Sequence, residues 1–210
     1  MKDLFVQAAD MDAKMFIYSI LQKHKAIGIR PITFDIEAHP LHDSGMVKSG
    51  AELSRLKKGK YTKIILIWDH EGSGREHKYQ APEIEVQIRQ KLDVITWSND
   101  NDAIALVPEL ETWLWHCKQA IASHYSLDIQ SLDRLIEVAA RQLGMASDRA
   151  MYVKPKELFE LLVRDGIGRT ISPKDFQMIG QYAGIHNLEA SKTFLKLRTT
   201  LRSWFPVEET

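Results

Sequence analysis

The sequence predicts an α/β fold with a mainly parallel central sheet flanked by helices and a helical carboxyl-terminal part. Up to about residue 122, short apolar runs alternate with segments of helical periodicity, the order typical of βα units. The run Lys63–Trp68 is apolar at nearly every position, like a strand buried on both faces of a parallel sheet. After about Ser123, apolar residues recur only at helical spacing. We therefore expect an α/β core over residues 1–122 and a helical extension over residues 123–210 that packs on it.

Length and composition narrow the class of protein. The chain has 210 residues, of which 44% are apolar, enough for a substantial core. Lys and Arg together number 28, as do Asp and Glu, so the zero formal charge excludes a strongly basic surface overall but not a local basic patch. The single cysteine, Cys117, excludes an intrachain disulfide and a multi-cysteine zinc site. With no signal-peptide pattern and no apolar run of about 18 residues, we expect a cytoplasmic protein without membrane contact.

The first elements are predicted to be a strand, a helix and an edge strand. Leu4–Ala8 is a short apolar run and the expected first strand. Asp10 or Asp12 is placed to cap the helix that follows it. Ile27–Ile36 alternates in the manner of a strand, and Pro31 within it indicates an edge or a bulge.

The middle of the chain surrounds the most apolar strand. His39–Gly50 contains glycine and proline and is predicted to be a loop that leads into a short helix ending near Lys58. The polar segment Asp69–Gln80 follows the apolar strand and is expected to be a loop at the mouth of the sheet. Pro82 is expected to open the next helix, because proline fits the first helical turn.

Two short strands and a series of helices complete the prediction. Val94–Trp97 and Ala103–Val107 are apolar runs divided by a polar turn, which predicts two strands. Pro108 then opens a helix whose apolar residues fall at i, i+3, i+4 and i+7. The later helical stripes are Leu132–Ala139, Leu158–Leu162, a helix begun at Ser172–Pro173, and Phe194–Phe205.

Acidic residues follow the most apolar strand directly. Asp69 ends it, Glu71 comes two positions later, and Gly72 and Gly74 let the backbone approach an ion or a phosphate. The carboxyl ends of parallel strands form the edge at which open α/β sheets bind ligands. Two carboxylates spaced by one residue can approach one hard cation, so the pattern predicts a Mg²⁺ or Mn²⁺ site. The alternative is a solvated loop that merely ends a buried strand.

Two further pairs of acids are expected near the same edge. Asp10 and Asp12 follow the first strand, where they either join the metal site or cap a helix. Glu109 and Glu111 lie in the first turn after Pro108, where acids also complement the helix dipole, and Glu111 flanks the apolar stripe. The predicted metal ligands are Asp69, Glu71, Asp10 and Asp12, and the predicted catalytic residues are Asp69, Glu71 and Glu111.

The charged loop after the acids carries the predicted phosphate-binding residues. Arg75 and Lys78 lie in the segment Gly74–Lys78, close in sequence to Asp69. Simple solvation of this loop is the alternative. Neither a Walker loop nor a dinucleotide glycine fingerprint is present, which argues against most nucleotide-binding kinases and phosphatases.

Four short segments together resemble one known family. Ile64–Gly72 looks like a strand ending in an acid pair, and Ala105–Leu114 is similar to a strand followed by a Pro-x-x-Glu-x-Trp-Leu helix start. Lys154–Glu157 and Ala190–Leu197 look like two later helix starts. The set resembles the Toprim-like domains of the DUF4276 type, small bacterial proteins related to the catalytic domains of topoisomerases, primases and overcoming-lysogenisation-defect nucleases.

The resemblance implies metal-dependent cleavage of phosphodiesters in nucleic acid and a place among proteins of bacterial antiviral defence systems. The family has a glutamate directly after the first strand, whereas this chain has Gln7. A neutral amide carries no charge for a metal, so Asp10 or Asp12 would have to replace the glutamate. Two functions remain open: a nuclease, or a catalytically inactive binding or scaffold subunit of a multiprotein defence complex. For the latter, Trp204 and Phe205 of the tail are a candidate partner surface, unless they pack on the core.

Overall fold

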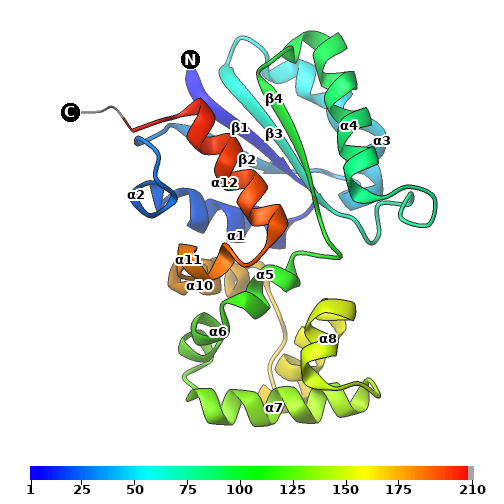
Figure 1. The fold of residues 1–210 in the computed structure, drawn as a ribbon, viewed down its shortest axis with the longest axis vertical. Helices are drawn as coiled ribbons and strands as arrows, with labels where there is room; N and C mark the ends of the chain where they lie inside the picture. Colours follow the sequence, from blue (N-terminus) through cyan, green and yellow to red (C-terminus); the bar gives the residue numbers. More distant parts are fainter. Residues whose placement is uncertain (208–210) are drawn as a thin grey trace.

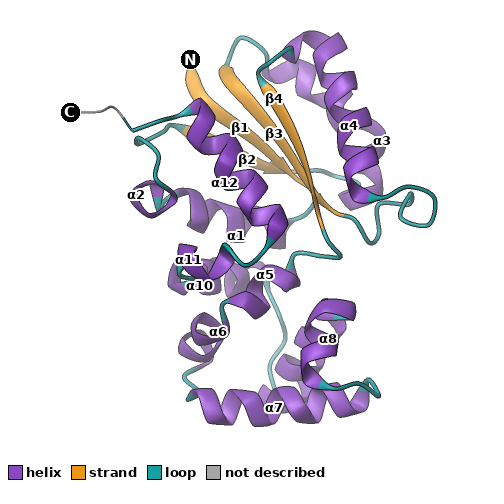
Figure 2. Ribbon diagram, in the orientation of Figure 1, coloured by secondary structure: helices purple, strands orange, loops and turns teal. Residues whose placement is uncertain are grey.

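A sheet of parallel strands forms the centre of the protein (Figures 1 and 2). The computed structural model describes residues 1–207. The sheet has four strands in the order β2-β1-β3-β4, and every neighbouring pair is parallel. The predicted α/β class is therefore confirmed. The strands are β1 (Lys2–Ala8), β2 (Phe34–Ala38), β3 (Tyr61–Asp69) and β4 (Asn101–Leu106).

Helices cover both faces of the sheet because the strands bury residues of both parities. Odd positions of β1 and even positions of β3, such as Phe5 and Leu66, belong to one apolar cluster with α3 (His42–Ser54) and α4 (Ala81–Leu92). Residues of the opposite parity, such as Ile67, face the second and larger cluster, which includes α1 and α12. Figure 1 shows α3 and α4 together on one side of the sheet and α1 with α12 on the other. The bounds of the latter two are Met11–Leu21 and Lys192–Trp204.

Most of the remaining helices extend the larger cluster below the carboxyl edge of the sheet, whereas the short helix that directly follows α1 lies beside it (Figure 1). Strand residues such as Val6 and extension residues such as Leu132 and Phe176 belong to this one cluster. Phe205 of the tail is buried in it and Trp204 packs against it. None of the helices in residues 1–207 is both long and apolar enough to cross a bilayer. The helices other than α1, α3, α4 and α12 are α2 (His24–Ile27), α5 (Glu111–His116), α6 (Lys118–Tyr125), α7 (Ile129–Gln142), α8 (Ser147–Val153), α9 (Pro155–Leu161), α10 (Pro173–Tyr182) and α11 (Ile185–Leu188).

Two of the predicted strands differ from the structure. Val94–Trp97 is not a strand but part of a π-helical turn, Asp93–Trp97, that continues α4. Val94 is 87% exposed, so its β-branched side chain has no core to pack against. Of the predicted strand Ile27–Ile36, only the last three residues belong to a strand, since β2 begins at Phe34.

The predicted loop at His39–Gly50 is largely helical. Helix α3 begins at His42 and contains both Gly45 and Gly50. At Gly50 an added Cβ would lie 3.0 Å from the Leu66 side chain of β3 and 2.7 Å from the sulfur of Met46. The glycine therefore lets α3 pack closely on the sheet, which outweighs its low helix propensity.

Charged side chains close the free edge of β4. Because β4 is the last strand of the sheet, the outward groups of its backbone have no strand partner. The N–H of Ala105 donates to Glu85 at 2.9 Å, and the N–H of Ala103 donates to Asp102 at 2.8 Å. The Lys196 ammonium, from α12, donates to the Ala103 carbonyl at 2.6 Å and lies 2.8 Å from a Glu85 oxygen. We call Glu85, Asp102 and Lys196 the edge network.

Candidate metal centre

Strand register brings the acids that follow β1 and β3 to the same level. Ala8 of β1 pairs with Ile67 of β3, and Asp10 and Asp69 each lie two residues beyond that pair. Both strands run parallel, so both aspartates reach the carboxyl edge of the sheet, beside the chain that leads into α5 (Figure 2). The convergence expected for these two residues is therefore present in the backbone.

Asp69 is held between two helix starts. One of its carboxylate oxygens accepts a hydrogen bond from the N–H of Leu110 at 2.9 Å. Its own N–H donates to the Asp43 carboxylate at 2.7 Å. The side chain is 9% exposed, and burial, followed by the charges of Glu111 and Asp43, raises its pKa well above the ordinary value. Two other carboxylates, those of Asp43 and Glu111, therefore act on Asp69.

One carboxylate oxygen of Glu111 has no hydrogen-bond partner in the described chain. Glu111 lies in the first turn of α5 and is 6% exposed, and the oxygen in question is Oε2. Burial and the charge of Glu109 raise the pKa of Glu111 to about 8. A buried polar atom left unsatisfied costs free energy, so a ligand that supplies a bond there is favoured.

Two neighbouring acids share this environment. Burial, with the charge of Asp10, raises the pKa of Asp12 to about 6. Burial also raises the pKa of Glu109 to about 7, and the charge of Glu71 adds to the effect. Asp10 caps α1 by accepting the N–H of Ala13 at 2.8 Å, so the capping role considered from the sequence is present. Its charge nevertheless acts on Asp12, and on Asp69 and Glu111 as well.

Two members of the site were not predicted. Asp43 enters from the first turn of α3, and its pKa is raised by burial despite the bond from the Asp69 N–H. Lys156 enters from the start of α9; burial lowers the pKa of its ammonium, but the charges of Glu111, Glu109 and Asp69 more than offset this and raise it. For Lys156 the sequence offers one indication, the helix start at Pro155. Asp43 lies in the segment His39–Gly50, which the sequence predicts to be a loop, so its position at a helix start was not predicted.

The other predicted residues lie around the rim. Glu71 is exposed, and its N–H donates to the Pro108 carbonyl at 3.1 Å. The guanidinium of Arg75 donates to Gln87 at 2.7 Å and lies 4.5 Å from the ring centre of Tyr79, which Lys78 also approaches at 5.2 Å. These contacts tie Arg75 to α4 and both cations to Tyr79. The cation that acts on the acids is Lys156.

Gln7 lies on the face of the sheet that α3 covers. It pairs in register with Leu66, three positions before Asp69, and alternation places it on the face of Phe5, which packs against α3. It is 6% exposed, and its carbonyl oxygen has no partner in residues 1–207. The acid at the level of Asp69 is thus Asp10 rather than the residue at position 7.

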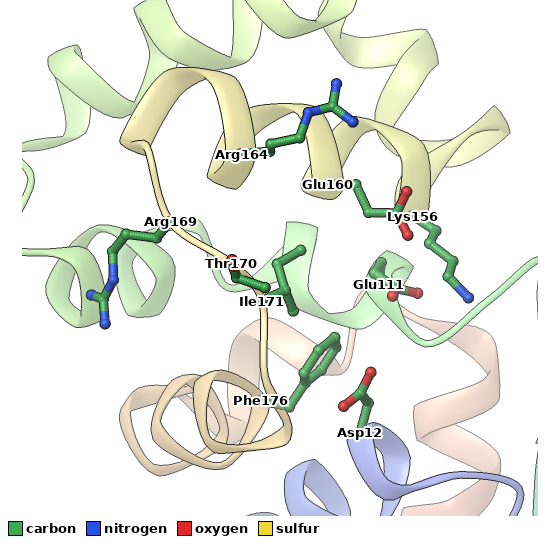
Figure 3. Close-up of a pocket in the computed structure, with 9 residues that line it drawn as sticks. All are labelled: Asp12, Glu111, Lys156, Glu160, Arg164, Arg169, Thr170, Ile171 and Phe176. Carbon is green, nitrogen blue, oxygen red and sulfur yellow. The ribbon is translucent and has the colours of Figure 1, made fainter.

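A cavity of about 400 Å³ opens beside these acids (Figure 3). Figure 3 shows Asp12 and Glu111 with the Lys156 ammonium at one end, which we call the acidic end. The cavity is therefore continuous with the candidate metal centre through Glu111. Its other lining residues are Glu160, Arg164, Arg169, Thr170, Ile171 and Phe176.

The donor set suits a hard divalent cation, although its present arrangement does not chelate one. Carboxylate oxygens are the ligands that Mg²⁺ and Mn²⁺ take in proteins, with waters or a substrate oxygen completing the shell. The unpartnered Oε2 of Glu111 is available for such a bond. Within the described part of the chain, no three His, Cys, Asp or Glu side chains stand close enough together to hold an ion. Side-chain rotation at Asp10, Asp69 and Glu111 is therefore needed to bring three ligands together.

The raised pKa values predict that the metal-free protein loses stability as the pH rises. The folded-state pKa of Glu111 is about 8, above its value of 4.5 in an unfolded chain, so the folded state holds the extra proton between these values. Its contribution is fully present below pH 4.5 and is lost through pH 8, at about 1.4 kcal/mol per pH unit per proton. Urea unfolding in a chelator should show this slope, and Glu111→Gln should flatten it, whereas Glu137→Gln on exposed α7 should not. An equal slope in the parent and Glu111→Gln would contradict this assignment.

Comparison with known proteins leaves the site to be judged on its own geometry. No family model matches the chain, and no significant match is found among curated proteins or solved structures. The functional argument therefore rests on the residues described above.

Proposed function

We propose that this protein is a metal-dependent phosphodiesterase that cleaves nucleic acid. The observation that carries the proposal is the cluster of buried carboxylates at one edge of a parallel sheet. The charge of Glu111 raises the pKa of Asp69, and one carboxylate oxygen of Glu111 has no hydrogen-bond partner in the described chain. Natural proteins avoid burying like charges unless a cation or a proton compensates them. A site for Mg²⁺ or Mn²⁺ is the function that best accounts for this arrangement.

The residues of the chain have distinct roles in this proposal. Asp69, Glu111 and Asp10 would hold the metal, and the exposed Glu71 would add its charge at the edge of the site. A bound Mg²⁺ or Mn²⁺ supplies charge stabilisation for a phosphate and lowers the pKa of a bound water. The Lys156 ammonium, whose charged form the acids favour, offsets the negative charge of the phosphate oxygens. Glu109, with a pKa of about 7, is placed to exchange a proton near neutral pH.

The same proposal includes the family and the cellular setting. We infer a Toprim-like protein of the DUF4276 type that acts in the cytoplasm, in bacterial antiviral defence, with nucleic acid and proteins of a defence complex as partners. The support is the Asp69–Glu71 pair after β3 and the Glu111–Leu114 helix start after β4, both at the sheet edge that the motifs require. Asp10 takes the place of the missing glutamate.

Proton release tests the metal site directly. Near neutral pH, Glu111 and Glu109 hold protons because their pKa values are about 8 and about 7, and metal ligation requires the ionised form. Calorimetric titration with MgCl₂ at pH 7 should therefore give a heat that varies with the ionisation enthalpy of the buffer, corresponding to about one proton released. Glu111→Gln should reduce that dependence, and Glu137→Gln should leave it unchanged. A titration without heat in every buffer would remove the metal from the proposal.

A scaffold function is the second candidate, and Lys156 favours it. Its ammonium lies in the field of Glu111, Glu109 and Asp69, so the acids have a built-in countercharge without a metal. An inactive Toprim-like subunit could keep the cluster in this form. Under this alternative MgCl₂ gives no heat, and Lys156→Met destabilises the protein more at pH 8 than at pH 5, because unprotonated acids then lose their counterion.

A further inference from the structure

The cavity beside the metal centre has two chemically different ends. The acidic end is formed by Asp12 and Glu111, with Lys156 beside them. The opposite side carries Arg164 and Arg169, which we call the arginine rim (Figure 3). A cavity used only to hold a cation has no need of cations along its rim. The separation of charge indicates an anionic ligand that reaches from the rim to the metal.

One wall of the cavity is a single helical face. Lys156, Glu160 and Arg164 lie at i, i+4 and i+8 along α9 and the π-helical turn Leu162–Ile167 that continues it. This spacing places Lys156 and Arg164 about 12 Å apart along the axis, on the same side. The wall therefore offers a cation at each end, a spacing suited to a ligand with successive phosphates and not to a single small anion.

The arginine rim is free to exchange its present contacts. Arg164 has a side chain that is 66% exposed and pairs with its sequence neighbour Asp165 at 2.6 Å. Arg169 is exposed and lies 5.8 Å from the ring centre of Tyr125. Exposed ion pairs contribute about 0–1 kcal/mol, whereas a bidentate guanidinium–phosphate contact is markedly stronger. A phosphate at the cavity mouth can thus displace these contacts.

Size and lining limit what occupies the interior. About 400 Å³ lies near the lower end of the range for ligand pockets, and Ile171 and Phe176 add apolar surface between the charged ends. The space suits one phosphate with its sugar and base, but not two stacked, paired strands. Enzymes that act within such pockets take single-stranded substrate or extrude a nucleotide from the duplex.

We propose that this cavity binds one unpaired nucleotide, with its phosphate at the Glu111 and Lys156 end and the next phosphate of the strand at the arginine rim. The inference rests on the proposed function, since it assigns the substrate of the same site. It predicts a preference for single-stranded nucleic acid over duplex. Free mononucleotides share the chemistry and fill the interior without reaching the rim.

Fluorescence anisotropy on the Asp69→Asn protein tests the proposal, because binding is then measured without cleavage. The probes are a labelled oligothymidylate, a blunt duplex of the same length, and thymidine monophosphate as competitor. The single strand should bind at least about tenfold more tightly than the duplex, and Arg164→Ala with Arg169→Ala should weaken it by about tenfold. Arg141→Ala is the matched control, since Arg141 is 76% exposed and pairs with Glu137 outside the cavity; its effect should stay below about twofold.

The outcomes separate this inference from the proposed function. Equal binding of single strand and duplex, or an arginine-rim variant that binds like the parent, overturns the inference even when the parent protein cleaves nucleic acid. The predicted binding pattern in a protein that never cleaves leaves the inference standing and removes the nuclease. Thymidine monophosphate does not reach the arginine rim, so its displacement of the strand at concentrations about tenfold higher supports the nucleotide assignment and identifies free mononucleotides as ligands.

Discussion

Replacing Asp69 by asparagine is expected to lower Mg²⁺-dependent cleavage of nucleic acid by about a thousandfold, equal to about 4 kcal/mol of activation free energy. The amide keeps the shape of the side chain, and its oxygen still accepts the Leu110 N–H that Asp69 accepts at 2.9 Å. The bond from the Asp69 N–H to Asp43 is a backbone donation and survives the change. The substitution thus removes a ligand charge and little else.

The folded state should be at least as stable after this change. Asp69 is buried among Glu111, Asp43 and Asp10, so its ionised form is repelled in the metal-free protein. Urea unfolding in a chelator should therefore give a midpoint no lower than that of the parent. Asp148→Asn, an exposed acid of α8, is the control and should alter neither cleavage nor stability. Cleavage by Asp69→Asn within a few-fold of the parent, at equal purity, excludes the metal role of this carboxylate.

The part of the site that the sequence predicts depends on a local rule. An acid that directly follows a parallel strand must emerge at the carboxyl edge of the sheet, whatever the rest of the fold does. Asp69 at the end of β3 and Asp10 two residues after β1 obey this rule, and their level is fixed by the pairing of Ala8 with Ile67. Glu111 follows because β4 also ends at this edge and α5 begins there.

The missed members depend on long-range packing. Asp43 reaches Asp69 only because α3 forms, and α3 tolerates Gly50 because the glycine lets it approach Leu66 of another element. Lys156 comes from a helix far along the chain, whose position against the sheet edge is set by the burial of the extension in the larger apolar cluster. The Pro155 helix start predicts that a helix begins beside Lys156, but no periodicity or spacing in the sequence predicts the contact of Lys156 or Asp43 with the acids.

The same distinction explains the errors in the fold. β3 is recognisable because every position from Ile64 to Asp69 is buried, as in a central strand of a parallel sheet. Val94–Trp97 has a similar composition over fewer residues, but only Trp97 is fully buried, while Ile95 is half-buried and Val94 is exposed. Short apolar runs do not distinguish a strand from a helical turn, so tertiary packing decides between them.

Replacing Lys196 by methionine is expected to destabilise the protein by about 2 kcal/mol, the largest stability effect that we predict. The ammonium donates to the Ala103 carbonyl at 2.6 Å and lies 2.8 Å from Glu85 and 3.6 Å from Asp102, both nearly buried. Methionine preserves the apolar stem of the lysine but leaves Glu85 and the Ala103 carbonyl without their cation. Asp102 keeps its contacts with Arg89 at 3.3 Å and the Thr200 hydroxyl at 2.6 Å. Urea unfolding measures the change, and an unchanged m-value shows that the native fold is kept.

Two further variants show whether the loss comes from the edge network. Lys192→Met removes an exposed cation from the same helix, so its effect on the unfolding free energy should stay within about 0.5 kcal/mol. Glu85→Gln added to Lys196→Met should recover part of the loss, because the amide can still accept the Ala105 N–H while its buried charge is gone. Equal destabilisation by Lys192→Met and Lys196→Met would mean that only the positive charge of α12 stabilises the protein, and not the specific contacts of Lys196 with Glu85 and Ala103. Recovery in the double variant instead assigns that part of the loss to the unpaired charge of Glu85 at the free edge of β4, since both variants lack the bond to the Ala103 carbonyl.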